Sequence, residues 1–362
     1  MTHTPAARPL LWPLVPVYRL GLALRELQLR SGLKPIRRLR WPVVSIGNLS
    51  TGGAGKTPLT IALVKALTAR GLHVDVLSRG YGRRRSALPL LVDPGGTAQE
   101  FGDEPLLIAR EAQVPVYVAA ERYRGGLLAE ANAAREQAIP AGTNHPLGTP
   151  AGSEGARAAP DTASRPGVHL LDDGFQHRQL ARDVDILLLS RTELADHLLP
   201  AGNLRDALHA AKRAQVIAIP ADEADVETEM KARGWKGQVW RLRRHMEIPP
   251  TDGPVAAFCG IARPDQFFEG LERGGVKIAA RTAFADHYRY SAHDLDRLAS
   301  AARAAGATAL LTTEKDYIRL GALAAAAPAS LSLKTVSLRV EIEDEEAAVD
   351  WLMARIDGKF SG

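Results

Sequence analysis

Short apolar runs alternate with helical segments along most of this chain. The run Val43–Ile46 is followed by a glycine-rich turn and by a helical stretch from Thr57 to Arg70, which Gly71 closes. Short apolar or β-branched runs of the same kind recur between helical stretches at 73–78, 114–119, 168–171, 184–189 and 216–219. Strands that alternate with helices predict an α/β fold in which helices sandwich a parallel sheet.

A second, smaller α/β unit is expected after residue 247. Pro249 and Pro250 interrupt the pattern, and a new apolar run begins at Val255. The alternation then continues to a late strand at 335–340 and a last helix at 344–356. We therefore predict two domains, at 1–247 and 248–362. Within the first, residues 139–167 are rich in Ala, Gly, Pro, Thr and Ser without an apolar period, which is typical of a flexible insertion.

The amino-terminal region carries an apolar segment that is too short to cross a membrane. Residues 10–24 are almost wholly apolar but include Arg19 and two prolines, whereas a spanning helix needs about 20 apolar residues. Val17, Leu20 and Leu24 fall on one helical face, with charged residues elsewhere. The pattern predicts an amphipathic helix over residues 10–30 that either lies on a membrane surface or packs on its own domain.

The charge balance favours anionic partners. The chain has 46 Lys and Arg against 41 Asp and Glu, a formal net charge of +5, and basic residues cluster at 25–40 and 83–85. Such runs attract phosphate-bearing surfaces, either nucleic acid or anionic lipid. The single cysteine, Cys259, excludes an internal disulfide and is expected to be a buried thiol.

A glycine-rich motif between a strand and a helix predicts a nucleotide site. The segment from Ser50 to Thr57 closely approaches the P-loop pattern, with Ser50 in place of the first glycine. Small residues let successive backbone N–H groups face phosphates, Lys56 can reach the β- and γ-oxygens, and the Thr57 hydroxyl can ligate Mg²⁺. The expected nucleotide-binding residues are Ser50, Thr51, Gly52, Gly53, Ala54, Gly55, Lys56 and Thr57.

Candidate metal-binding and acid–base residues lie in other segments. Asp172 and Asp173 end an apolar strand, where P-loop enzymes place a second group that organises Mg²⁺, although Asp-Asp-Gly is also a common turn. Asp103 opens a helical stretch and is by default its N-cap. From local sequence alone, Arg205 is compatible with a surface role and His287 with a structural one.

Taken together, the ordered motifs resemble those of the tetraacyldisaccharide 4'-kinase family. The resemblance covers most of the chain and is carried by Ser45–Leu49 running into the P-loop, Ser78–Arg83, Gly102–Pro105, Asp172–His177, Leu199–Arg205, Phe258–Pro264, Phe284–Tyr288 and Thr312–Asp316. It implies a phosphotransferase with an alcohol acceptor, which transfers the γ-phosphate of ATP to the 4'-hydroxyl of tetraacyldisaccharide 1-phosphate in lipid A biosynthesis. It also implies that a two-stranded linker, with a strand near 335–340 paired to one near 239–243, joins two α/β domains around the active-site cleft.

Several site residues follow from the resemblance by motif. Asp103 matches the family's catalytic aspartate, His287 its histidine partner, and Arg205 an arginine near the transferred phosphate. Lys56, Arg205 and Mg²⁺ would neutralise charge on the phosphates, which phosphoryl transfer needs more than covalent catalysis. Asp206 stands where the family pattern has glutamate. The implied metal ligands are Thr57, Asp172, Asp173 and Asp206, and the implied sugar-site residues are Ser78, Arg79, Tyr81, Gln176 and His177.

The implied lipid substrate also favours a membrane location. A lipid with four acyl chains resides in a membrane leaflet, so an amphipathic helix with basic flanks would let its kinase reach it. The expected location is the cytoplasmic face of the bacterial inner membrane, as a peripheral protein without an obligate protein partner.

Two other function classes are disfavoured by the sequence. A P-loop GTPase should carry Asn-Lys-x-Asp for guanine, and this sequence lacks that motif; a regulatory P-loop ATPase is the related alternative. A nucleic-acid-binding module should place aromatic side chains among its basic ones, whereas aromatics are 5% of the chain and none lies within the basic run 25–40. The dependence of ATP turnover on lipid, on nucleic acid or on neither would separate these classes.

Overall fold

One twelve-stranded sheet extends through the computed structural model, which describes residues 8–53, 55–84, 88–138, 167–326 and 331–358. Its strand order is β10-β9-β11-β12-β8-β7-β6-β1-β5-β2-β4-β3. The strands are β1 (Val43–Asn48), β2 (His73–Ser78), β3 (Leu90–Leu91), β4 (Val116–Val118), β5 (Gly167–Asp172), β6 (Val184–Leu188), β7 (Val216–Pro220), β8 (Gln238–Glu247), β9 (Val255–Cys259), β10 (Ile278–Ala283), β11 (Ala309–Thr313) and β12 (Ser332–Ile342).

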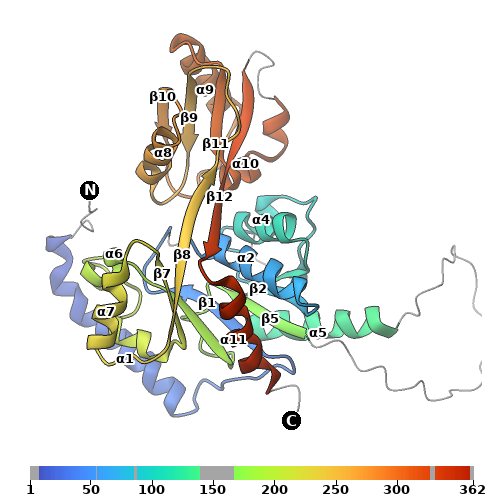
Figure 1. Cartoon of the computed structure of the whole chain (residues 1–362), viewed down its shortest axis with the longest axis vertical. Helices are drawn as coiled ribbons and strands as arrows, with labels where there is room; N and C mark the ends of the chain where they lie inside the picture. The colour runs from blue at the N-terminus through green and yellow to red at the C-terminus, as the bar shows by residue number, and fades with distance from the viewer. Residues whose placement is uncertain (1–7, 54, 85–87, 139–166, 327–330, 359–362) are drawn as a thin grey trace, which may run out of the picture.

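Figure 1 shows two lobes joined by the long strands β8 and β12. We call the part built on β1 to β7 the large lobe and the part built on β9 to β11 the small lobe. The α-helices are α1 (Val15–Arg30), α2 (Lys56–Ala69), α3 (Ala98–Phe101), α4 (Asp103–Ala112), α5 (Arg122–Ala138), α6 (Arg191–Ala195), α7 (Ala224–Ala232), α8 (Pro264–Arg273), α9 (Ala292–Ala304), α10 (Glu314–Leu320) and α11 (Glu345–Asp357).

Strand β1 is buried along its whole length because side chains pack on both faces of the sheet. Val44 and Ile46 join a cluster that includes Leu63 of α2, whereas Val43 packs in a different cluster with Tyr117. Successive side chains of a strand point to opposite faces, and a parallel strand that is covered on both sides reads as a continuous apolar run. The predicted α/β sandwich is confirmed.

The parallel register brings the ends of several strands to one edge of the sheet. Strand β1 pairs in parallel with β5 and β6, and Ile46 lies opposite Asp172. Because β1 runs directly into the glycine-rich turn before α2, this register places the Asp172-Asp173 turn beside that loop. The sheet therefore juxtaposes two motifs that are more than 100 residues apart in sequence.

Strand β12 joins the lobes by pairing with a different neighbour at each end. Its first half pairs in parallel with β11, with Ala309 opposite Ser332, and its second half pairs antiparallel with β8, with Arg244 opposite Val340. The predicted two-stranded linker is thereby confirmed. Strand β8 ends at Glu247, and β9 begins at Val255.

Helix α11 departs from the predicted division of the chain. We predicted it within a C-terminal domain at 248–362, but Leu352 and Ile356 pack in the core of the large lobe together with Leu63. The chain therefore returns to the large lobe after β12. The predicted insertion 139–167 lies outside the described residues except for Gly167, which begins β5.

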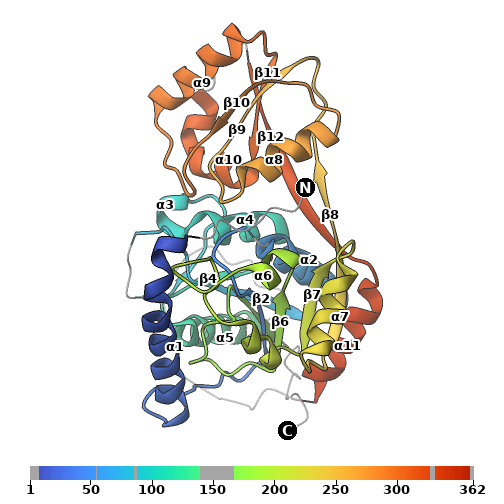
Figure 2. The same ribbon diagram turned by 90° about the vertical axis from the view of Figure 1, so that its left-hand side faces the viewer.

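Helix α1 lies along the outside of the large lobe, as Figure 2 shows. Val15, Tyr18 and Leu22 pack against a core cluster of that lobe, whereas Leu20 and Leu24 are 60% and 51% exposed. One side of the helix thus belongs to the domain, and the apolar side predicted from the sequence faces outward. None of the helices in the described part of the chain combines the length and the apolarity needed to cross a bilayer.

Candidate active site

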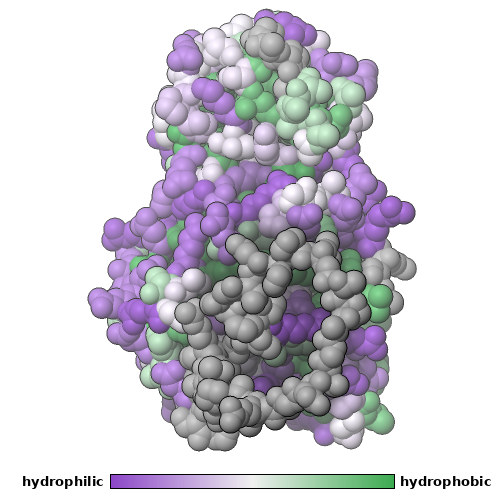
Figure 3. Space-filling model, turned by 90° about the vertical axis from the view of Figure 1, so that its right-hand side faces the viewer, coloured by the Kyte–Doolittle hydropathy of each residue, from purple (hydrophilic) through white to green (hydrophobic). Residues whose placement is uncertain are grey.

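A cavity of about 760 Å³ lies between the two lobes. A second cavity of about 1300 Å³ shares Gly53, Lys56 and Lys315 with the first, so that the P-loop borders both. Figure 3 shows hydrophilic side chains gathered at the waist between the lobes. Residues of both lobes line the first cavity, among them Lys56, Asp173, Arg205, His287, Lys315 and Arg319.

The glycines of the P-loop adopt left-handed backbone conformations and lead directly into α2. Gly52, Gly53 and Gly55 have φ of +81°, +49° and +84°, a region that glycine adopts without strain. Gly55 is the N-cap of α2, so the positive end of the helix dipole points into the loop. The Thr57 side chain lies buried in the first turn. Of the predicted nucleotide-binding residues, Ala54 lies outside the described part of the chain.

Lys56 and Arg205 converge on shared oxygen acceptors. Arg205 donates two hydrogen bonds to the Asp173 carboxylate, at 3.0 and 2.8 Å, and the Lys56 ammonium is 3.5 Å from the same carboxylate. Asn48 Oδ1 accepts from Lys56 Nζ at 3.1 Å and from Arg205 Nη2 at 2.7 Å. Burial alone would raise the pKa of Asp173, but Arg205 and Lys56 hold it well below its usual range. The predicted cations therefore lie side by side.

Asp172 has a different environment from its neighbour. It is buried, and its carboxylate accepts hydrogen bonds from the Thr60 and Ser78 hydroxyls at 3.4 Å each. Burial, together with the charges of Glu104 and Asp173, raises the pKa of Asp172 to about 7. A buried carboxylate among other acidic groups is stabilised by an added cation.

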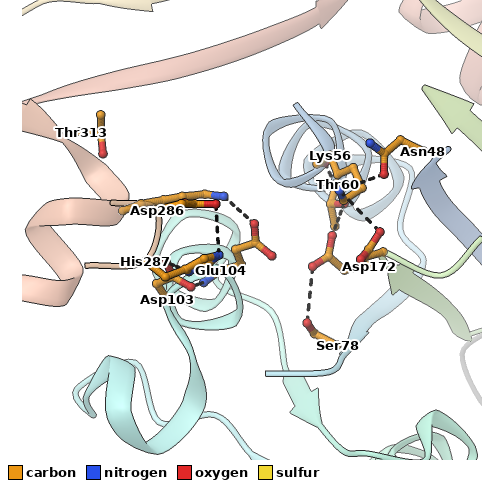
Figure 4. A network of polar contacts seen from close by, with 12 residues as sticks. Asn48, Lys56, Thr60, Ser78, Asp103, Glu104, Asp172, Asp286, His287 and Thr313 are labelled. Carbon is orange, nitrogen blue, oxygen red and sulfur yellow. Dashed lines mark hydrogen bonds and ion pairs between the residues drawn. The ribbon is translucent and has the colours of Figure 1, made fainter. Parts of the chain in front are cut away.

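Asp103 and His287 meet across the cleft (Figure 4). The two are separated by 184 positions in sequence, yet His287 Nδ1 lies 3.2 Å from Asp103 Oδ2. Gly102, with φ +93°, is the N-cap of α4, so Asp103 is the first helical residue and not the expected N-cap. Asp103 is 4% exposed. Burial opposes ionisation of its carboxyl, but His287, Arg319 and Lys315 hold its pKa well below the usual range.

Three charged residues beside Asp103 and His287 were not predicted as site residues from the sequence. Lys315 Nζ is 2.5 Å from Glu104 Oε1, and Arg319 Nε donates to Asp103 Oδ2 at 2.7 Å. Both cations come from α10, and both acidic partners begin α4. Glu104 and Lys315 lie inside motifs that carry the family resemblance, whereas Arg319 lies three residues after the last of these motifs. Its spacing from Asp316 on α10 is the signal that could have identified it.

The predicted sugar-site residues gather around the first cavity. Ser78, Arg79, Tyr81, Gln176 and His177 all line it. The Tyr81 ring lies 5.0 Å from the His287 ring, centroid to centroid, and the Gln176 amide donates to the Asn48 carbonyl at 2.9 Å. Burial and nearby arginines, Arg122 first among them, lower the pKa of His177 to about 4.

Asp206 is oriented differently from the other predicted metal ligands. Its carboxylate lies 3.7 Å from the guanidinium of Arg213, and neither cavity at the cleft includes it in its lining. Its neighbour Arg205 does line the first cavity. The metal role of Asp206 stays a prediction without support from these contacts.

A model of the tetraacyldisaccharide-1-P 4'-kinase family, LpxK, matches residues 7–357. The chain belongs to this family. Membership in the 4'-kinase family confirms the resemblance that the motifs indicated and the lipid A 4'-kinase function that it implied. The enzyme is accordingly a phosphotransferase with an alcohol acceptor.

Named relatives and a solved structure agree with this 4'-kinase assignment. A tetraacyldisaccharide 4'-kinase of Koribacter versatilis is 37% identical, over 95% of this chain and 98% of the relative. One of Anaeromyxobacter dehalogenans is 38% identical, over 89% of this chain and 84% of the relative. LpxK from Aquifex aeolicus, solved in complex with ATP, is 29% identical with a TM-score of 0.67 and covers 96% of this chain and 98% of its own.

Proposed function

We propose that the first cavity is where the γ-phosphoryl group of ATP passes to the 4'-hydroxyl of the lipid A precursor. The observation that carries this proposal is the arrangement of two chemically different walls around one cavity. Lys56 and Arg205 form a cationic wall beside the P-loop. His287 lines the opposite side of the cavity and contacts Asp103, which is buried directly behind that lining, and we call these two residues the acid–base wall. Phosphoryl transfer requires both a stabilised phosphate and an oriented acceptor hydroxyl.

The cationic wall would neutralise charge on the transferred group. The P-loop backbone would hold the phosphates of ATP, and Lys56 would contact the β- and γ-oxygens as a point charge. Arg205 is held by Asp173 and Asn48 at the same spot. A guanidinium that is already oriented loses less entropy when it meets the developing charge.

The residues present fit a Mg²⁺ ion at the P-loop. Mg²⁺ binds through one or two protein oxygens and completes its shell with water and substrate phosphates. Thr57 and Asp172 supply such oxygens, and an added cation would offset the burial and the neighbouring acidic charges that raise the pKa of Asp172. The oxygens of Asp173 already accept from Arg205, which makes Asp172 the better ligand. When bound at these residues, the ion would supply positive charge that stabilises the phosphates during transfer.

The acid–base wall would orient the acceptor. The 4'-oxygen attacks the γ-phosphorus, the bond from phosphorus to the β,γ-bridging oxygen breaks, ADP leaves, and the hydroxyl proton passes to Asp103. A carboxylate whose pKa is depressed is a weak base toward an alcohol, so it accepts this proton late, as the loose transition state allows. His287, in contact with Asp103 Oδ2, would share the proton.

The acceptor would reach the cavity from a membrane surface. Leu29 of α1 and Lys34 line the cavity. Helix α1 therefore carries both a residue of the cavity wall and an exposed apolar face. An amphipathic helix with basic flanks suits an anionic lipid surface. We infer a peripheral position on the cytoplasmic face of the inner membrane.

The decisive experiment is transfer of labelled γ-phosphate from Mg-ATP to tetraacyldisaccharide 1-phosphate in mixed micelles. We expect the wild type to label the lipid and Asp103→Ala to lose about 10²- to 10⁴-fold in rate, as for loss of a general base. Binding of a fluorescent ATP analogue should survive in this variant, because the P-loop is unaltered. ATP hydrolysis by the wild type without labelled lipid would contradict the proposal.

A further inference from the structure

Arg319 belongs to the small lobe, yet its guanidinium reaches the carboxylate proposed to receive the acceptor hydroxyl. Its Nε donates to Asp103 Oδ2 at 2.7 Å, and its Nη2 contacts the same oxygen. His287 Nδ1 approaches that oxygen as well, at 3.2 Å. The side chains of Arg319 and Asp103 are 6% and 4% exposed, so water competes little for these contacts.

The guanidinium is fixed from behind by a buried network. Arg319 Nη1 donates to Asp316 Oδ1 at 2.9 Å and to the Gly260 carbonyl at 2.5 Å. Asp316 is fully buried, and the same Oδ1 accepts from the Tyr290 hydroxyl at 2.9 Å and from the Gly260 N–H at 3.0 Å. The small lobe therefore holds Arg319 in place from its own side, independently of Asp103.

One carbonyl ties Arg319 to His287. The Gly260 oxygen accepts the Arg319 Nη1 bond and also the backbone N–H of His287, at 3.1 Å. His287 has φ +58°, a left-handed conformation that a non-glycine residue adopts at a cost. The Gly260 bond helps to offset this cost, so a single backbone group places both partners of Asp103.

The two oxygens of Asp103 consequently have different tasks. Arg319 and His287 occupy Oδ2, whereas Oδ1 accepts from the Glu104 backbone N–H at 3.0 Å. A carboxylate oxygen can accept two hydrogen bonds. Oδ1 therefore keeps a lone pair for one further donor.

We propose that Arg319 is a positioning residue for phosphoryl transfer: it turns Asp103 so that Oδ1 faces the acceptor hydroxyl, and it does so only while the small lobe contacts α4. This inference rests on the proposed role of Asp103. Arg319 lines the first cavity, but in this inference it acts through the Asp103 carboxylate and not on ATP or lipid directly. The chemistry of the large lobe thus depends on a cation that the small lobe supplies.

The test compares Arg319→Gln and Arg319→Lys with Arg303→Gln, a matched change at an exposed arginine of α9. We expect Arg319→Gln to lower kcat for lipid by about 10²-fold, the size of effect that a misplaced catalytic group produces, with an unchanged KM for ATP. Arg319→Lys should recover part of the loss, because an ammonium keeps the charge without the planar fork. Arg303→Gln should behave as wild type.

The pH profile adds a readout that a purely structural role would not move. The charged groups that face Asp103 are Arg319, His287, Lys315 and Glu104. Burial raises the pKa of Asp103, and the Arg319 charge lowers it. Without that charge the pKa of Asp103 should rise, so the acid limb of kcat/KM for lipid should move to higher pH. An unmoved limb with an unchanged kcat in folded Arg319→Gln overturns the inference.

A double-mutant cycle separates this inference from the function that it deepens. In an Asp103→Asn background, Arg319→Gln should change the residual rate by less than about twofold, because residues that act as a unit are not additive. An equal loss in both backgrounds shows a structural role and overturns the inference. Full activity of Asp103→Asn itself would instead refute the proposed function. If Arg319→Gln does not fold, the same pH profile and the same double-mutant cycle measured with Arg319→Lys test the inference.

Discussion

The two walls of the cleft are built in opposite ways. The cationic wall lies entirely within the large lobe, where positive-φ glycines lead directly into Lys56 and the first turn of α2, and Arg205 joins Lys56 from a later segment. The acid–base wall combines Asp103 of the large lobe with His287 and Arg319 of the small lobe, more than 180 positions away. The first wall belongs to one lobe, whereas the second combines residues of both lobes.

In the proposed mechanism, this difference would give the linker a part in assembling the site. Arg339 of β12 lies 3.0 Å from Glu111, 2.9 Å from Glu247 and 3.1 Å from Glu314. These glutamates belong to α4, β8 and α10, so one guanidinium connects the helix that carries Asp103, the linker and the helix that carries Arg319.

The largest effect should come from breaking the local wall. Lys56→Ala removes the cation nearest to the phosphates, and we expect lipid phosphorylation to fall by about 10³-fold, as for loss of a preorganised charge. The contacts between Asp103, His287 and Arg319 should remain. Steady-state kinetics with Mg-ATP measures this effect, with Lys65→Ala on the exposed side of α2 as the control. A loss below about tenfold would place the principal phosphate contact elsewhere.

A smaller effect should come from weakening the assembled wall. Lys315→Met removes the ion pair with Glu104, whose pKa is held low chiefly by Lys315. The half-buried Glu104 would then lack its main partner at the contact between α4 and α10. We expect kcat for lipid to fall about tenfold, which corresponds to about 1.4 kcal/mol in the barrier, with little change in thermal stability of the large lobe.

The control for this prediction is Lys334→Met, a lysine of β12 that is not among the residues lining the first cavity. Wild-type kinetics of Lys315→Met, with the small lobe still docked, would show that the ion pair between α4 and α10 is dispensable.

The same contrast explains what the sequence could reveal. The P-loop and the alternation of strands and helices are local patterns, so the α/β sandwich, the nucleotide loop and the position of Lys56 were predictable. Asp103 was ambiguous because a first-turn aspartate is usually a cap, and only the family resemblance paired it with His287. The only local signal for Arg319 was its spacing from Asp316 on α10, which predicts an ion pair within the helix and not a contact with Asp103. Its role depends on how β8 and β12 bring the small lobe onto α4, which no short stretch of sequence encodes.

A third prediction concerns the surface that lies outside both walls. Leu20→Ser with Leu24→Ser removes apolar area from the exposed face of α1 and leaves the packed residue Tyr18 untouched. We expect a loss of about 2 kcal/mol in binding to anionic vesicles, or about thirtyfold in partition. Turnover of lipid presented in detergent micelles should change less. Leu127→Ser, on exposed α5, is the control, and unchanged sedimentation of the double variant with vesicles would refute a membrane role for this face.

The last prediction concerns a charged cluster that belongs to neither wall. His169 of β5 is fully buried, with Nδ1 2.7 Å from Asp75 Oδ1 and Nε2 3.4 Å from Glu130 Oε1. Burial opposes its charge, but the two carboxylates raise the pKa of His169 to about 9. Because this folded-state pKa lies above the unfolded value of about 6.5, the cluster stabilises the fold fully below that pH and loses its contribution as the pH rises through 9.

His169→Gln should therefore reduce the fall in unfolding free energy between pH 6.5 and 9.5 by about 3 kcal/mol, the free energy that corresponds to this pKa shift. Urea unfolding of the two proteins at both pH values measures the difference, and His293→Gln, on exposed α9, serves as the control. Phosphorylation at pH 7.5 should stay near wild type, because His169 lines neither cavity at the cleft. Equal pH dependence in the wild type and His169→Gln would show that the buried histidine is neutral. A loss of activity without a loss of stability would show instead that β5 transmits changes at His169 to Asp172, three residues further along the strand. The cationic wall would then depend on residues outside the cleft.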